Sequence, residues 1–198
     1  MATLRSIRWT LLPAVAVLLL ATSIHADSPA GPPEKTSIWS GNRFYRADMD
    51  PETNLTTVYF VDGDREKKLW SMIGWFWMAE LAGDGEHMIV GTDGGPAVPA
   101  KAGPDHILIY FVKRGEVIGT VTLGEVVKRR SSMPKTASHR IWGEYLGIDE
   151  DNRLRIKTCE GVTMWFDVTT GNLIRQEREG PSQPHLPLGP FRRADDRP

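Results

Sequence analysis

The chain has 198 residues, a formal net charge of −1 at pH 7 and one cysteine. The near-neutral charge argues against a general nucleic-acid-binding protein, which would carry a basic balance, so we expect no nucleic-acid partner. The single cysteine, Cys159, excludes an internal disulfide bond and a metal site built from several thiolates.

Residues 1–26 have the features of a secretory signal peptide. Arg5 and Arg8 precede an apolar run over residues 11–24, and Ala26 is a small residue suited to cleavage. The run is shorter than the roughly 20 apolar residues that cross a bilayer. We therefore expect cleavage after Ala26, a secreted or periplasmic location and no transmembrane segment in the mature chain. An uncleaved signal anchor is the alternative.

The remaining chain divides into one domain and two flanking segments. Residues 27–37 are rich in Pro, Gly and Ser and predict a disordered leader. Residues 178–198 contain five prolines and predict a disordered tail. Between them, residues 38–177 have the strand-forming patterns of a single all-β domain.

Three segments of this domain share one pattern, an apolar run with an aromatic pair, then a polar turn and a returning strand. They are residues 58–70, 109–119 and 164–174. Phe60, Phe111 and Phe166 occupy equivalent positions. The last two copies also match upstream, where Asp84 and Asp149 lie in equivalent turns. A period near 50 residues with four strands per unit is typical of a β-propeller blade.

The turn FDVTTGNL over residues 166–173 resembles the closing hairpin of WD-repeat and quinoprotein-type propeller blades. The resemblance covers residues 75–123 and 141–177 well, and residues 38–72 less well. It implies an all-β fold of two to three four-stranded antiparallel sheets. Because a closed propeller needs four or more blades, we expect a partial propeller or a stacked-sheet or sandwich arrangement. Self-association would cover the open sheet edges, and the chain's own tails are the alternative.

Each of the two clear units is predicted to be a four-stranded antiparallel sheet. The expected strands are near 75–81, 87–91, 106–113 and 116–123, and near 141–147, 153–158, 162–168 and 172–177. Between the units, residues 123–130 favour one short helix. The Gly- and Pro-rich residues 92–106 predict a long loop without secondary structure.

The connector over residues 128–140 is the best candidate for a binding site, because it is strongly basic and has no acidic residue. Arginine can hold phosphate, sulfate or carboxylate groups in a fork geometry. The candidate binding residues are Arg129, Arg130, Lys135, His139 and Arg140. They predict contact with a protein or an anionic component of the cell envelope. A solvated connector without a ligand is the alternative.

No sequence motif indicates catalysis, a metal site or a cofactor, since HExxH, calcium-loop, phosphate-loop and GxSxG patterns are absent. We therefore predict no catalytic residue, no metal and no cofactor, and favour an exported binding protein. One alternative is an envelope-acting hydrolase with a site assembled from loops around His106, His139 and Glu144. Another is a structural accessory of a secreted complex.

The hairpin around Cys159 has one register that separates apolar from polar side chains. A three-residue turn over residues 159–161 pairs Ile156 with Met164, and Gly161 then supplies the positive φ that such a turn needs. Cys159 is expected at the hairpin tip with an accessible thiol.

On the polar face of the same hairpin, this register pairs Arg155 with Trp165 and Arg153 with Asp167. It predicts a guanidinium–indole contact from the first pair and an ion pair from the second.

Overall fold

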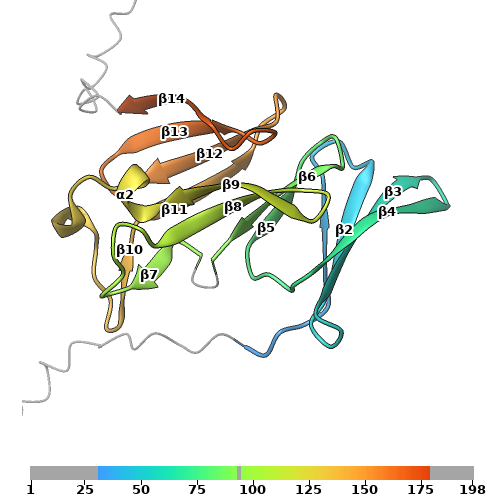
Figure 1. Ribbon diagram of the computed structural model, residues 1–198, viewed down its shortest axis with the longest axis horizontal. Helices are drawn as coiled ribbons and strands as arrows, with labels where there is room; N and C mark the ends of the chain where they lie inside the picture. The colour runs from blue at the N-terminus through green and yellow to red at the C-terminus, as the bar shows by residue number, and fades with distance from the viewer. Residues whose placement is uncertain (1–30, 93–94, 179–198) are drawn as a thin grey trace, which may run out of the picture.

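The computed structural model describes residues 31–92 and 95–178 (Figure 1). The expected signal peptide and its cleavage site lie outside the described residues, as do residues 27–30 of the expected leader and residues 179–198 of the expected tail. The last two residues of the expected leader, Thr36 and Ser37, belong to the first strand instead. No helix in the described part of the chain is long and apolar enough to cross a bilayer.

The first sheet is antiparallel, with its four strands in chain order. It consists of β1 (Thr36–Trp39), β2 (Tyr45–Asp50), β3 (Leu55–Asp62) and β4 (Arg65–Ile73). This is the unit whose repeat pattern was weakest in the sequence, and it nevertheless forms a complete four-stranded sheet.

The second sheet is also antiparallel and four-stranded, in the order β5-β6-β8-β9. Its strands are β5 (Ala79–Leu81), β6 (His87–Gly91), β8 (Ile107–Lys113) and β9 (Glu116–Thr122). The strand between β6 and β8, β7 (Ala97–Pro99), does not belong to this sheet and lies in an insertion.

The third sheet, in the order β11-β12-β13-β14, repeats the arrangement. Its strands are β11 (Gly143–Ile148), β12 (Arg153–Thr158), β13 (Val162–Asp167) and β14 (Leu173–Arg178). The predicted all-β class with several four-stranded antiparallel sheets is therefore confirmed, and the strands of the second and third sheets lie close to their predicted positions.

Two insertions interrupt the repeat between β6 and β11. The predicted short helix is present as α2 (Leu123–Val126), followed by a 3₁₀ turn at Arg130–Ser132. The prediction of a loop without secondary structure over residues 92–106 is wrong. This segment contains β7 (Ala97–Pro99), which pairs antiparallel with β10 (His139–Ile141). The two insertions thus form their own two-stranded sheet.

The core consists of two apolar clusters, one on each side of the second sheet. Successive residues of β6 point to opposite faces, so that Met88 and Val90 pack toward the first sheet while Ile89 packs toward the third. On the second side the rings of Phe111 and Phe166 lie 6.1 Å apart. Burial on both faces explains why β6 is apolar almost throughout rather than alternating.

The predicted register of the Cys159 hairpin is confirmed. Ile156 lies opposite Met164, and Gly161 has φ +72°. The prediction of an accessible thiol is wrong, since Cys159 is only partly exposed and packs against the core.

The expected side-chain contacts on the polar face of this hairpin are replaced by others. The guanidinium carbon of Arg175, on β14, lies 4.0 Å from the centroid of the Trp165 ring, so Trp165 stacks with Arg175 rather than with Arg155. Arg153 bonds to Asp149, with 3.2 Å between Nε and Oδ2, while Asp167 accepts hydrogen bonds from Thr169 in its own turn. The pairing of β12 with β13 therefore places these side chains on the predicted face, but β14 and the adjacent turns provide their contact partners.

Candidate functional site

The basic connector lies at one end of the molecule, where β7, β10 and α2 gather (Figure 1). Pairing of His139 with Pro99 and of Arg140 with Val98 holds the two insertions together. A backbone hydrogen bond of 3.1 Å from Ala100 to Ser138 extends this pairing. The connector is therefore a structured hairpin and turn rather than an open loop.

Glu160 holds the start of the connector and was missed by the sequence analysis. Its carboxylate accepts hydrogen bonds from the backbone N–H groups of Lys128 at 3.1 Å and Arg129 at 2.8 Å, and from the Ser132 hydroxyl at 3.3 Å. The side chain is only 4% exposed. Burial raises the pKa of this carboxyl, but the N–H donors outweigh burial and lower the pKa overall.

The five predicted binding residues have different roles in the structure. Arg129, Arg130 and Lys135 are exposed and available for contact. Arg140 instead supports the connector, because its Nη1 donates to the backbone oxygen of Arg130 at 3.0 Å. The Nδ1 of His139 lies 2.7 Å from the Ser138 hydroxyl at the hairpin end. We define the basic surface as Lys128, Arg129, Arg130 and Lys135.

The residues of the hydrolase alternative lie on separate parts of the fold. His106 precedes β8, His139 belongs to β10, and Glu144 is an exposed residue of β11. None of the three lines either cavity described below. Across residues 31–92 and 95–178, no group of three His, Cys, Asp or Glu side chains could hold a metal ion. The hydrolase stays an untested alternative.

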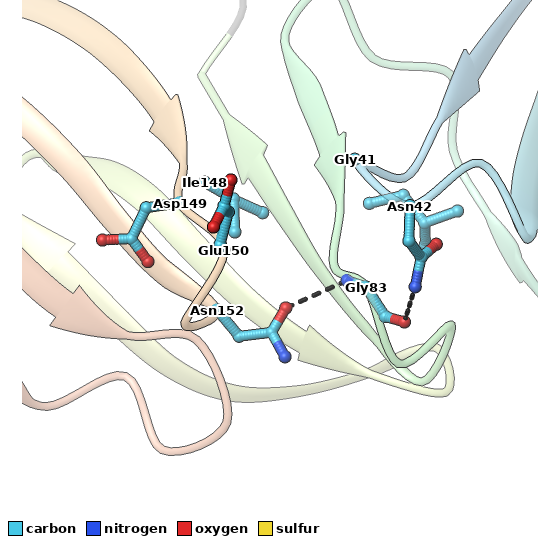
Figure 2. Close-up of a pocket in the computed structure, with 8 residues that line it drawn as sticks. Gly41, Asn42, Gly83, Ile148, Asp149, Glu150 and Asn152 are labelled. Atoms are coloured by element: carbon cyan, nitrogen blue, oxygen red, sulfur yellow. Dashed lines mark hydrogen bonds between the residues drawn. The ribbon is translucent and has the colours of Figure 1, made fainter.

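A cavity of about 420 Å³ lies where the first turns of the three sheets meet (Figure 2). We call it the turn cavity, and its polar lining comes from Asn42, Asp149, Glu150 and Asn152. Asn42 donates to the oxygen of Gly83 at 2.6 Å, and the N–H of Gly83 donates to Asn152 at 3.0 Å. Figure 2 shows both amides directed at this one glycine, so one residue links three sheets.

The acidic residues predicted to be equivalent form equivalent turns. Oδ1 of Asp84 accepts the N–H groups of Glu86 and His87, at 2.8 and 3.0 Å. Oδ1 of Asp149 accepts those of Asp151 and Arg153, at 3.1 and 3.0 Å. Because these carboxylates satisfy turn backbone, their role is structural.

A second hollow, which we call the apolar groove, has a volume of about 350 Å³. It lies between the end of the first sheet and the second sheet. Its lining includes Met72, Ile73, Phe76, Val90, Tyr110 and Val117. Its chemistry differs from that of the basic surface, since its lining is mostly apolar and includes no charged side chain.

Comparison of the chain with protein-family models finds no match, and comparison with curated proteins finds none either.

Proposed function

We propose that the protein is an exported binding module that contacts an anionic partner, either a protein or an envelope component, through the basic surface. The observation that carries this proposal is the pairing of β7 with β10. The two insertions that depart from the repeat are ordered against each other, and the second of them exposes Arg129, Arg130 and Lys135. In repeat architectures, insertions on one face often form the binding face.

The charge balance at this end favours an anion. Lys128, Arg129, Arg130 and Lys135 are all exposed, whereas the acid closest to the connector backbone, Glu160, is buried and already engaged with backbone N–H groups. Nε of Arg129 lies 3.7 Å from Oε1 of Glu160, and the Arg129 side chain is still 72% exposed. The exposed arginines can therefore bind phosphate, sulfate or carboxylate groups without first breaking a buried contact.

The three successive four-stranded sheets support the view that these units are propeller-like blades in a partial propeller. Each is antiparallel, each follows chain order once the β7 insertion is set aside, and each packs face to face on the next through an apolar cluster. The charged start and apolar run of residues 1–26 support export to the periplasm or the exterior.

The test is binding to an immobilised polyanion, dextran sulfate, at increasing salt concentration. Arg129→Ala with Arg130→Ala should elute at lower salt and show a shallower dependence of affinity on salt. The matched control is Arg65→Ala with Lys67→Ala, which removes the same charge from exposed positions of β4. Both double variants should change the free energy of unfolding by less than about 0.5 kcal/mol.

Earlier elution of the connector variant alone supports a localised anion site. Equal loss in both variants would show only a general charge effect, and unaltered elution of the connector variant would remove the proposed site.

A further inference from the structure

Three cations share one face of β12. Arg153, Arg155 and Lys157 alternate with Leu154 and Ile156, which belong to the core cluster that the second and third sheets share. Because side chains of a strand alternate between faces, the three cations lie on the face of the third sheet that points away from this core. They form a cationic row along the strand rather than a compact cluster.

This cationic row leads to the basic surface. β12 ends at Thr158, and Glu160, two residues later, accepts the backbone N–H groups of Lys128 and Arg129. At the usual rise per residue, Arg155 lies about 10 Å from the end of the strand. Cations therefore follow one another from the connector onto the third sheet.

The cations of the row differ in how far they are already engaged. Arg153 bonds to two carboxylates of the turn before β12. Arg155 is partly exposed, and the residues opposite it in the sheet, Gly147 and Trp165, carry no charge. Its Nε has no hydrogen-bond partner among the described residues. Because an unpaired guanidinium gains more from an added anion than a paired one, an anionic ligand would extend as far as Arg155.

Acidic residues flank the cationic row on both sides. Glu144 on β11 lies opposite Lys157, and Glu177 on β14 lies opposite Thr163, the next position across the sheet. Both glutamates are exposed. A flat anionic surface such as a membrane would meet both carboxylates at once and be repelled, whereas a narrow chain can follow β12 between them.

The backbone of β12 has no free edge. The strand lies between β11 and β13 and pairs with both. An acidic peptide could not add to it as a further strand, which is a common way for an extended peptide to gain affinity. Recognition would depend on the repeated anionic groups of the ligand, and this favours an anionic glycan over a protein segment.

We propose that the ligand is a linear glycan bearing sulfate, phosphate or carboxylate groups, which runs from the basic surface along β12 to Arg155. This inference rests on the proposed function, because it extends the same site and names the class of its ligand. Contacts made in sequence along one chain reinforce one another, so the affinity should grow with ligand length until the chain reaches Arg155.

The probes are a fluorescent heparin disaccharide and a fluorescent heparin octasaccharide. The disaccharide is too short to contact the connector and Arg155 together. Arg155→Gln removes the guanidinium and keeps much of the length of the side chain. Arg65→Gln, at an exposed position of β4, is the matched control. Circular dichroism and thermal unfolding check that both variants fold.

Fluorescence anisotropy should show that the octasaccharide binds the unmodified protein at least about tenfold more tightly than the disaccharide. Arg155→Gln should weaken octasaccharide binding at least about fivefold and disaccharide binding less than about twofold. Arg65→Gln should change either affinity less than about twofold. Arg129→Ala with Arg130→Ala should weaken binding of both ligands, since both contact the connector.

The outcomes separate this inference from the proposed function. If dextran sulfate binds through the connector but Arg155→Gln does not selectively weaken the octasaccharide, the anion site ends at the connector and only the glycan inference is wrong. If neither dextran sulfate nor the oligosaccharides bind, the proposed function fails as well.

Two further controls test the class of ligand. Tighter binding of a polyglutamate peptide of equal charge would assign the cationic row to an acidic protein. Adsorption to phosphatidylglycerol vesicles that Arg155→Gln reduces would assign it to a membrane. Either result would overturn the choice of a glycan.

Discussion

Glu160 shows how one buried carboxylate can order a basic segment. It satisfies two consecutive backbone N–H groups, those of Lys128 and Arg129, just before the 3₁₀ turn. Sequence offered no signal for this contact, because Glu160 lies 31 residues from Arg129 and hairpin-tip glutamates are usually solvated. The exposed cations of the basic surface are thus positioned by a residue outside the connector.

Glu160→Gln should lower the free energy of unfolding by about 1–2 kcal/mol. The amide retains the size of the side chain, but its NH₂ group replaces one acceptor and faces a backbone donor. Urea unfolding at neutral pH measures the change. Glu116→Gln on the exposed β9 is the control and should stay within about 0.5 kcal/mol. A similar effect of both substitutions would contradict the role of Glu160.

Glu160 should also contribute to acid sensitivity. Its folded pKa is below the ordinary value of 4.5, so its stabilisation is complete above pH 4.5 and is lost as the pH falls through the lower folded pKa. Over this acidic range, Glu160→Gln should lose less stability than the unmodified protein. Parallel stability curves for the two proteins would show that Glu160 does not titrate in this way.

Cys159 should react slowly in the folded protein. Burial raises the pKa of its thiol, and its Sγ lies 3.7 Å from the Ser132 hydroxyl under the 3₁₀ turn. A raised pKa and restricted access both reduce the reactive thiolate. We expect Ellman's reagent to react on the order of tenfold slower than in urea at the same mildly alkaline pH. Equal rates would indicate the open hairpin tip expected from the sequence.

At the scale of elements, strands and one hairpin register were predictable because they follow local rules. Alternation of Leu154 and Ile156 with charged residues fixed the faces of β12, and Gly161 fixed the turn. The β7–β10 pair was not predictable, because each strand has three residues and pairs with a segment about 40 residues away. The basic residues were found from composition, whereas their separation into exposed and supporting roles required this tertiary pairing.

Gly161 provides a direct test of the turn. No atom lies within 4 Å of a Cβ built there, so a substitution there meets backbone strain at φ +72° rather than a clash. Gly161→Ala should cost about 1–2 kcal/mol, and Gly161→Asn less, because Asn tolerates the left-handed region. Urea unfolding of both variants measures this order. Equal stability of Gly161→Ala and the unmodified protein would show that the turn readily changes conformation.

At the scale of the whole molecule, the three sheets are joined in two ways. Two apolar clusters hold neighbouring faces together. In addition, the second and third sheets are linked where the carboxylate of Glu80 accepts the N–H of Ile148 at 2.9 Å, and burial raises the pKa of that carboxyl. The turn cavity adds the polar link through Gly83. Because these links connect all three sheets, we expect one cooperative unfolding transition rather than separate ones.

A double-mutant cycle at the turn cavity tests this coupling. Asn152 has φ +56°, so Asn152→Gly permits the same backbone conformation while it removes the acceptor for Gly83, and it also adds backbone freedom to the unfolded chain. Asn42→Ala removes the donor to the same residue, together with the Oδ1 that accepts hydrogen bonds from the Ser40 hydroxyl and the Phe44 N–H. Asn152→Gly should cost about 1 kcal/mol and Asn42→Ala more, and the pair should deviate from additivity by at least about 0.5 kcal/mol, since both residues fix one glycine. Calorimetry should show a single transition in every variant. Additive losses, or a second transition in the double variant, would mean that the sheets respond independently and that Gly83 does not couple them.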